Sequence, residues 1–382
     1  MHEPLPEPEL AARRERLSAR LEEHGLDAVF LPPSSDLEYL TGLERDVPSF
    51  GQTAYAHGWV AGAFLAAGRE PLYVLPRMVI VFHLFDRVPD NCVVVNEADD
   101  GTALFAQAAR SLGGVRRLGI GARTWGETVL GLQKALPQAT IVNATPLVNR
   151  LRSVKSELEL ELMTAACLIA DQAMAATAPS VQPGVTLVEL AEEVEHQLRA
   201  RGSRTPSFPT HIFTFGREDS RDSTLASGRE PVRPGEPVLF DFGAVHCGYC
   251  SDFGRTVVCG EPPDEYERVY DVMLAAQEAG RAAAVPRALA SEVNAACRAP
   301  IEEAGLGEFF RHRMGHGIGL DVHEQPFLSV ESETPLEAGM TFTDEPSILW
   351  PGRFGVRIED VVACAETGGH RLSGLSRAPI YT

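Results

Sequence analysis

Apolar side chains near the N-terminus recur at helical spacing and then give way to short apolar runs. Leu10, Leu17 and Leu21 lie on one stripe and Gly25 is a stop signal, so the pattern predicts a helix over residues 9–24. The runs that follow, such as AVFL and PLYVLP, have the length of buried strands and alternate with helical segments. This alternation is typical of an α/β domain. Strands are predicted at residues 28–31, 72–76 and 92–96.

Two helix starts are marked clearly in the middle of the chain. Ser156 is followed by Glu159, and Thr186 is followed by Glu189, and each pair is the signature of a capping box before an apolar run. The second of these helices is expected to end near Gly202. Beyond it, the pattern predicts strands at 238–244, 248–258, 340–346 and 354–364 and helices at 264–284 and 291–304.

The length of 382 residues is large for one domain. We place a domain boundary at about residue 152, where the alternating first part ends and the first capping box begins. The expected fold class is α/β (α+β), with an α/β domain over residues 1–152 and a strand-rich domain over residues 153–382. The first part contains no clustered chemistry, so the function is expected in the second.

The composition narrows the classes of function. The chain has 34 Lys and Arg against 53 Asp and Glu, a formal net charge of −19, which argues against nucleic acid or an anionic membrane as a partner. It contains no run of the roughly 18 to 20 apolar residues that a membrane span needs, and its acidic, proline-rich N-terminus is unlike a secretory signal. Seven scattered cysteines suit a reducing compartment. We therefore expect a cytoplasmic protein.

Five side chains in the last third of the chain predict a metal site. They are Asp241, Asp252, His316, Glu345 and Glu359, and each stands in an apolar or glycine-rich phrase such as VLFDFGA, GHGIG or FTDEP. A buried carboxylate without a partner costs several kcal/mol or more, so four of them in a strand-rich core require compensation. Two divalent cations would bring the charge close to balance.

Strand alternation decides which of these acids converge, because every second side chain faces the same way. The segment HCGYC turns the chain back, and the resulting hairpin brings the two aspartates of the set side by side. The same alternation directs Asp344 away from Glu345 and Asp360 away from Glu359.

A histidine-containing phrase, RMGHGIGLDVHEQP, completes the donor set. The glycines beside His316 let the backbone pass close to a crowded centre. His323, seven residues later, is a natural second imidazole for binding or proton transfer. Hard oxygen donors with one nitrogen and no thiolate suit manganese, cobalt or magnesium better than a closed zinc site.

The order Asp, Asp, His, Glu, Glu with these flanking phrases resembles the pita-bread metallopeptidases, which include methionine aminopeptidase, aminopeptidase P and prolidase. In the first half, GLDAVFL followed by LEYLTGL resembles the creatinase-type N-terminal domain. The resemblance implies a creatinase-like α/β domain over residues 1–152. It implies a pita-bread domain over residues 153–382, with a central antiparallel sheet flanked by helices. This layout favours the prolidase and aminopeptidase P branch.

The resemblance also implies two divalent metal ions, with manganese as the first choice and cobalt or zinc as alternatives. It assigns Asp241 to one ion and His316 and Glu345 to the other, and it makes Asp252 and Glu359 the bridging ligands. A hydroxide held between the ions would attack the scissile carbonyl, since metal binding lowers the pKa of water towards about 7.

Three residues receive catalytic or substrate-binding roles from the resemblance. Glu345 would be the general base. His323 would hold the substrate or stabilise the tetrahedral intermediate, and Arg357 would pair with a neighbouring carboxylate or with the substrate. The expected activity is hydrolysis of the amide bond before proline in a short peptide, as a dipeptidase or an aminopeptidase. A homodimer is expected as well.

One position departs from the family's pattern. Family members usually carry a further histidine, which contacts the substrate's amide, where this chain has Ser223 in REDSRDST. His211 is about a dozen positions too early in the sequence to replace it directly. Two alternatives therefore stay open: the same scaffold acting on a small non-peptide substrate, as an ectoine-type hydrolase or a metal-dependent lyase, and a non-catalytic binding module.

Overall fold

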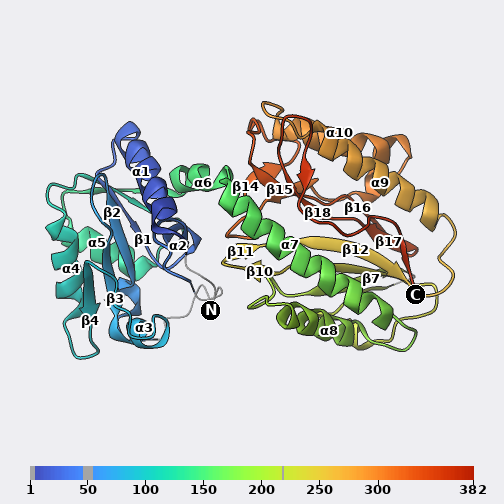
Figure 1. The fold of residues 1–382 in the computed structure, drawn as a ribbon, viewed down its shortest axis with the longest axis horizontal. Helices are drawn as coiled ribbons and strands as arrows, with labels where there is room; N and C mark the ends of the chain where they lie inside the picture. Colours follow the sequence, from blue (N-terminus) through green and yellow to red (C-terminus); the bar gives the residue numbers. More distant parts are fainter. Residues whose placement is uncertain (1–4, 46–54, 217–218) are drawn as a thin grey trace. The chain divides into compact units, whose positions relative to one another are not determined.

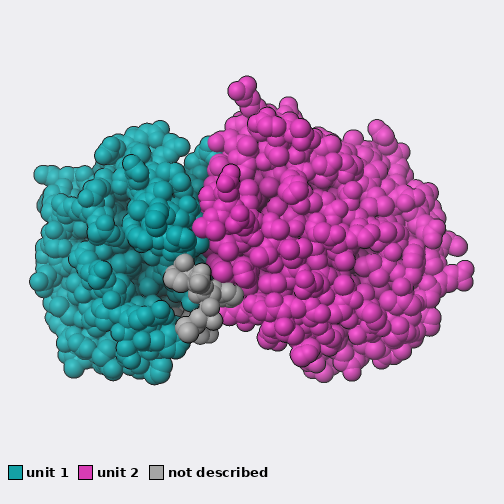
Figure 2. All heavy atoms as spheres, viewed as in Figure 1, with its two compact units in different colours: residues 1–152 teal, residues 153–382 magenta. Residues whose placement is uncertain are grey.

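The computed structural model describes residues 5–45, 55–216 and 219–382. It separates into two compact units, residues 1–152 and 153–382, which are coloured separately in Figure 2. No helix among the described residues is long and apolar enough to cross a membrane.

The first unit is a six-stranded mixed sheet with helices packed against it (Figure 1). The strand order is β4-β3-β2-β1-β5-β6. All four side chains of β1 are buried, as its apolar run predicts, and β1 pairs antiparallel with β2 and parallel with β5. The rings of Phe30, Phe64 and Phe105 pack together in the core of this unit, with centroids 4.7 to 5.7 Å apart.

The first unit contains these helices and strands: α1 Glu7–Glu23, β1 Ala28–Leu31, α2 Ser35–Thr41, η1 Gly58–Val60, β2 Gly62–Ala66, β3 Leu72–Pro76, α3 Arg77–Phe82, β4 Cys92–Val95, α4 Gly101–Ser111, β5 Arg117–Ile120, α5 Gly126–Ala135, β6 Thr140–Asn143 and α6 Thr145–Ser153. The helix predicted over residues 9–24 is α1, and the three strands predicted from apolar runs are β1, β3 and β4.

The second unit has two five-stranded sheets, each covered by a pair of helices (Figure 1). One sheet has the order β20-β12-β9-β7-β8 and packs against α7 and α8. The other has the order β14-β13-β15-β18-β19 and packs against α9 and α10. Pairing is antiparallel except between β12 and β20. The unit is thus α+β, with antiparallel sheets flanked by helices as the resemblance implied, and its strands are divided between two main sheets.

The second unit contains these helices and strands: α7 Glu157–Thr177, η2 Ala178–Ser180, α8 Leu187–Ala200, β7 His211–Gly216, β8 Asp219–Asp222, η3 Ala226–Arg229, β9 Pro237–Phe242, β10 Val245–His246, β11 Tyr249–Cys250, β12 Phe253–Val258, α9 Tyr266–Ala283, α10 Ala290–Glu303, η4 Gly307–Phe309, β13 Gly315–Gly317, β14 Glu324–Leu328, β15 Thr341–Asp344, β16 Ser347–Trp350, β17 Phe354–Arg357, β18 Asp360–Ala363, β19 His370–Arg371 and β20 Ile380–Tyr381.

Both predicted capping boxes are present. The Ser156 hydroxyl accepts from the backbone N–H of Glu159 at the start of α7, and the Glu159 carboxylate accepts from the backbone N–H of Ser156. Thr186 and Glu189 make the same reciprocal bonds at the start of α8. Each box satisfies backbone donors that a helix end leaves open.

The long strands predicted over residues 248–258 and 354–364 are each broken in two, and the strand predicted over residues 340–346 ends at Asp344, before a new strand begins at Ser347. The breaks fall at Asp252, Glu345 and Glu359. At the second and third breaks the backbone bonds elsewhere: the Glu345 N–H donates to the Met314 carbonyl at 3.0 Å, and the Glu359 N–H donates to the Gly254 carbonyl at 2.9 Å. Three candidate ligands therefore lie between strands, and at two of them, Glu345 and Glu359, the backbone is hydrogen-bonded to a different segment.

The last two breaks belong to one long hairpin. Its lower part is the β15–β18 pair, in which Asp344 faces Asp360, and its upper part is the β16–β17 pair, in which Ser347 faces Arg357. The same register holds on both sides of the interruption. Glu345 and Glu359 therefore stand opposite each other at the break.

Candidate metal centre

Asp241 and Asp252 come from the two arms of the β9–β12 hairpin. The strand register pairs Asp241 with Gly254, two positions beyond Asp252, so the aspartates are diagonal neighbours on one face. Glu359 joins them because its backbone forms an isolated bridge with Gly254. One carboxylate oxygen from each of the three lies within 4.8 Å of the other two.

Position 254 requires glycine because three segments of the chain meet there. A Cβ at this position would lie 2.8 Å from Oε2 and 2.9 Å from Cβ of Glu359, and 2.8 Å from Cδ of Arg357. Real Cβ atoms do not approach other heavy atoms so closely, so a side chain here would push Glu359 away from the aspartates.

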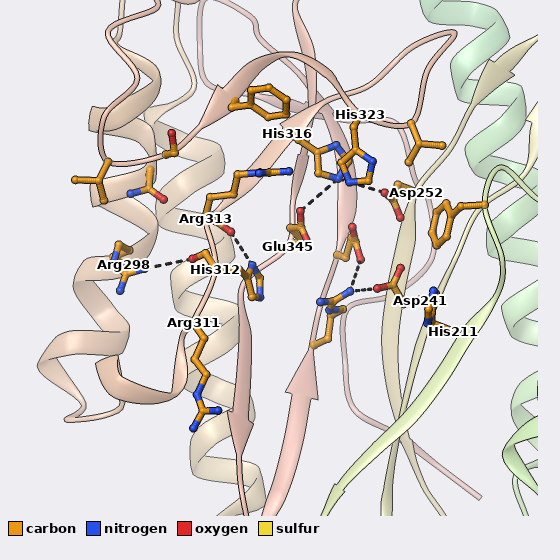
Figure 3. A pocket seen from close by; sticks show the side chains of 18 of the residues that line it. His211, Asp241, Asp252, Arg298, Arg311, His312, Arg313, His316, His323 and Glu345 are labelled. Atoms are coloured by element: carbon orange, nitrogen blue, oxygen red, sulfur yellow. Dashed lines mark hydrogen bonds and ion pairs between the residues drawn. The ribbon is translucent and has the colours of Figure 1, made fainter. Parts of the chain in front are cut away.

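His316 faces the carboxylates from β13 in the other sheet (Figure 3). Its Nδ1 lies 3.1 Å from the carbonyl oxygen of Gly317 and donates to it, which leaves the lone pair of Nε2 free. That Nε2 lies 3.5 Å from Oδ2 of Asp252 and 3.5 Å from Oε1 of Glu345. These separations are too long for good hydrogen bonds and leave room for an ion between the three groups. Thr343 holds Glu345 through a 3.1 Å bond from its hydroxyl.

Burial perturbs the titration of Asp252, Glu359, Glu345 and His316. It raises the pKa values of Asp252 and Glu359 well above the ordinary carboxyl range, and the neighbouring carboxylates raise them further. Burial also raises the pKa of Glu345 to about 7 and lowers the pKa of His316 to about 3. The imidazole of His316 is therefore neutral, as a metal ligand must be. The raised pKa values of the carboxyl groups mean that the surrounding protein supplies too little positive charge to stabilise their ionised forms.

The donor atoms fit a divalent cation. Oδ1 of Asp252 and Oε2 of Glu359 are buried and accept no hydrogen bond among the described residues. A buried carboxylate oxygen without a partner is costly, and metal coordination is the usual remedy. These atoms, the free Nε2 of His316 and the space at Gly254 together match a site for hard cations.

Arg357 supplies positive charge at the edge of the cluster. Its guanidinium is buried, forms an ion pair with Asp241 and lies 3.6 Å from Oε2 of Glu359. Its Nε donates to the hydroxyl of Ser347 at 2.9 Å. Arg357 is thus a partner of the cluster's carboxylates, one of the two roles expected for it.

The cluster lines a pocket of about 800 Å³. A pocket of this volume accommodates a small ligand such as a short peptide. His323 also lines it, and its ring centroid lies 4.0 Å from that of His316. Figure 3 shows both imidazoles directed toward Asp252 and Glu345.

Three further residues of the pocket were missed as site residues in the sequence. His312 and Arg313 precede β13, and His211 begins β7, where it pairs with Asp241 in the strand register. His211 Nδ1 lies 3.1 Å from Oδ2 of Asp222. The spacing His-x-x-x-His in HRMGH was a usable signal for His312; nothing local marked the other two.

Ser223 is not among the described residues that line the pocket. Its hydroxyl accepts from the backbone N–H of Ile212 at 3.0 Å and donates to the carbonyl of Thr210 at 3.1 Å. It therefore continues the β7–β8 pairing and offers no group to a ligand.

Comparisons with known proteins agree with this architecture. Residues 161–366 match the model of metallopeptidase family M24, and residues 13–154 match the creatinase/prolidase N-terminal domain. An uncharacterised peptidase of Bacillus subtilis is 30% identical over 363 residues, covering 94% of this chain and 97% of that protein. A Xaa-Pro dipeptidase of Pyrococcus furiosus is 37% identical over 230 residues, covering 60% of this chain and 66% of that protein. The crystal structure of a prolidase from Thermococcus sibiricus superposes with a TM-score of 0.86 at 28% identity, covering 98% of this chain and 99% of that one.

Proposed function

Because the chain belongs to metallopeptidase family M24, in the branch with a creatinase/prolidase N-terminal domain, we propose that it hydrolyses the amide bond before proline in short peptides. The observation that carries the proposal is the cluster of Asp241, Asp252 and Glu359, whose ligand atoms converge within 4.8 Å on a pocket of peptide size. We propose further that residues 1–152 and 153–382 are its two domains.

Five residues are proposed to hold two divalent cations. They are Asp241, Asp252, His316, Glu345 and Glu359, and the buried oxygens of Asp252 and Glu359 that accept no hydrogen bond among the described residues support this assignment. When bound, the cations would polarise the scissile carbonyl and lower the pKa of water towards about 7. Manganese is the first choice, with cobalt or zinc as alternatives, because the donors are mainly hard oxygens.

Glu345 is proposed as the general base. Its Oε1 lies 3.5 Å from Nε2 of His316 and accepts from the Thr343 hydroxyl at 3.1 Å, which holds the carboxylate beside the proposed cations. His323 is proposed to hold the substrate's carbonyl group, since its ring lies beside His316 in the pocket. Arg357 would orient Asp241 through their ion pair.

His211 is proposed to take over the role of the histidine that family members carry where this chain has Ser223. It lines the pocket, stands opposite Asp241 in the strand pairing, and is held at Nδ1 by Asp222. This contact fixes the ring and leaves Nε2 available to a substrate. A homodimer and a cytoplasmic location remain our proposals, and light scattering of the purified protein tests the first.

A hydrolysis panel tests the proposed function. The protein is loaded in turn with manganese, cobalt and zinc and assayed with Xaa-Pro dipeptides, Xaa-Pro-Xaa tripeptides and matched peptides with alanine for proline. We expect cleavage of the proline peptides and none by Glu359→Gln, which lacks one carboxylate of the cluster. Metal-loaded protein that cleaves none of these peptides but acts on ectoine or another small non-peptide substrate would favour the alternative.

A further inference from the structure

The segment that carries His323 has no regular secondary structure. It comprises residues 318–323 and joins β13 to β14. His323 is exposed in the pocket, and its ring forms no hydrogen bond with any described residue. The ring lies against that of His316, with the centroids 4.0 Å apart. The position of this imidazole therefore depends on how the backbone on either side of it is held.

Glu324 holds the backbone on the C-terminal side. It is the first residue of β14 and stands opposite Gly317, the neighbour of His316, in the strand register. Its side chain is buried, and it is not among the described residues that line the pocket. Successive side chains of an extended chain point in opposite directions, so His323 faces the pocket while Glu324 faces the interior. A buried carboxylate thus lies directly behind the pocket imidazole.

Lys155 is the partner of this carboxylate. Its Nζ lies 2.6 Å from Oε1 of Glu324, and the two side chains are 1% and 5% exposed. Lys155 lies between α6 and α7, where its backbone N–H donates to the carbonyl of Gly339 at 3.0 Å. The next residue, Ser156, begins the capping box of α7. The ammonium group is therefore attached to a backbone that is fixed on both sides.

The ion pair also contacts the segment that carries His323. A Cβ added at Gly319 would lie 2.7 Å from Oε1 of Glu324 and 3.0 Å from Cε of Lys155, so the segment passes directly over the pair. The carbonyl of Gly319 accepts from the backbone N–H of Cys250 at 2.8 Å. The segment is thus held by the ion pair on one side and by β11 on the other.

Stability alone does not account for this pair. Removing two charges from water costs about as much free energy as their attraction returns, and well-packed apolar residues often serve equally well. We propose that Lys155 and Glu324 are positioning residues whose ion pair holds His323 against the metal-binding His316. This inference rests on the proposed function, in which His323 holds the carbonyl group of the substrate. A shift of a catalytic site group by about 1 Å is enough to lower the rate roughly 100-fold.

A double-mutant cycle tests the proposal. Lys155→Met keeps the length of the side chain and removes its charge, so kcat/KM for an Xaa-Pro dipeptide should fall by about 10- to 100-fold at unchanged metal content. His323→Ala should fall at least as far. Combining the two should cause no further loss, because the pair acts only through His323. Losses that multiply in the double variant would overturn the proposal.

A second pair of variants separates positioning from folding. Lys155→Met alone leaves Glu324 as an unpaired buried charge, which destabilises the protein. Lys155→Met/Glu324→Leu removes both charges and should melt close to the wild-type temperature, yet kcat/KM should still be lowered. Glu324→Gln keeps an acceptor oxygen for the ammonium group and should retain more activity than Glu324→Leu. Wild-type kcat/KM in Lys155→Met/Glu324→Leu would overturn the positioning role.

Asp171→Asn is the matched control. Asp171 lies on α7, is buried, and accepts from the backbone N–H groups of Gly374 at 2.6 Å and Leu375 at 3.1 Å. It is not among the described residues that line the pocket. Asp171→Asn should therefore lower the melting temperature and leave kcat/KM unchanged. A loss of kcat/KM equal to that of Lys155→Met would assign both effects to stability and overturn the proposal.

Failure of the proposed function has a different signature. If the wild-type protein cleaves no proline peptide, the positioning role is still tested without a substrate. Crystal structures of the wild-type protein and of Lys155→Met/Glu324→Leu, both loaded with manganese, are compared at the two imidazoles. Displacement of the His323 ring from His316 in the variant supports the proposal. An unchanged centroid separation of 4.0 Å overturns it.

Discussion

Asp344 and Asp360 face each other across β15 and β18, each directly beside a glutamate of the metal cluster. Asp360 accepts hydrogen bonds from Arg255 at 2.8 Å and from Gln277 at 3.1 Å. Neither carboxylate oxygen of Asp344 has a hydrogen-bond partner among the described residues. Adjacent residues therefore belong to two separate acidic sets, of which only the glutamates reach the pocket.

This separation predicts opposite outcomes for two neighbouring substitutions. Glu345→Gln should lower kcat by roughly 100-fold or more, because both a cluster carboxylate and the proposed base are lost. Asp344→Asn should retain activity and bound metal, since it keeps the shape of a side chain that lies outside the pocket. The two variants are compared by steady-state kinetics and metal analysis. An equal loss of activity in both would contradict the separation.

Gly254→Ala should disrupt the cluster without removing a ligand. The added methyl group would approach Glu359 to within 3 Å, so we expect a loss of metal affinity and a decrease of about 1–3 kcal/mol in the free energy of unfolding. Chemical denaturation and metal titration measure the two effects. Gly126→Ala is the control, because no heavy atom of the described residues lies within 4 Å of a Cβ built there and the position begins α5. Unchanged metal binding by Gly254→Ala would show that Glu359 is not held in place by close contact.

The stability of the metal-free protein should fall as the pH rises from 5 to 8. Burial raises the pKa of Glu345 from 4.5 to about 7, and the pKa values of Asp252 and Glu359 are raised as well. The folded state then retains protons that the unfolded chain releases, so stabilisation present below pH 4.5 is lost as the pH rises through 7. For Glu345 alone this amounts to on the order of 3 kcal/mol.

Thermal melting of chelated protein across this pH range measures the effect. The protein loaded with manganese is the control and should show the opposite slope, because cations bind only the ionised carboxylates. A melting temperature of chelated protein that is constant from pH 5 to 8 would mean that the acids are already ionised without metal.

His211→Ala should lower kcat/KM by roughly 10- to 100-fold, because the pocket loses the imidazole that pairs with Asp222. Ser223→Ala should leave kcat/KM unchanged and cost about 1 kcal/mol of stability, because its hydroxyl bonds to the backbone of Thr210 and Ile212. Kinetics and denaturation of both variants separate the two roles. Full activity in His211→Ala would exclude the proposed replacement.

The sequence predicted correctly the elements whose boundaries are set by interactions between residues close together in the chain. The capping boxes at Ser156 and Thr186 determine where α7 and α8 begin, and the reciprocal side-chain bonds responsible involve residues three apart. The family assignment was also available from the sequence, because the ligand phrases are distinctive and the matches cover both halves of the chain.

The strand breaks were not predictable from alternation. Residues 340–346 and 354–364 keep a strand-like pattern through Glu345 and Glu359, yet the ladder stops there because Met314 and Gly254 take the backbone hydrogen bonds. Both partners are distant in sequence. Arg313 was missed as a pocket residue for the same reason: its guanidinium packs on Phe327, which β14 brings alongside from the far side of a loop.

The hairpin that carries Glu345 and Glu359 turns at residues 351–353, beyond the β16–β17 ribbon. Because Glu345 and Glu359 are the same number of residues away from this turn, extra residues in the turn would leave the distance between the two carboxylates unchanged. A deletion in only one arm, between a glutamate and the turn, would instead slide the arms past each other and separate the pair. Homologues are thus expected to differ in the size of this turn and to keep the two arms equal in length.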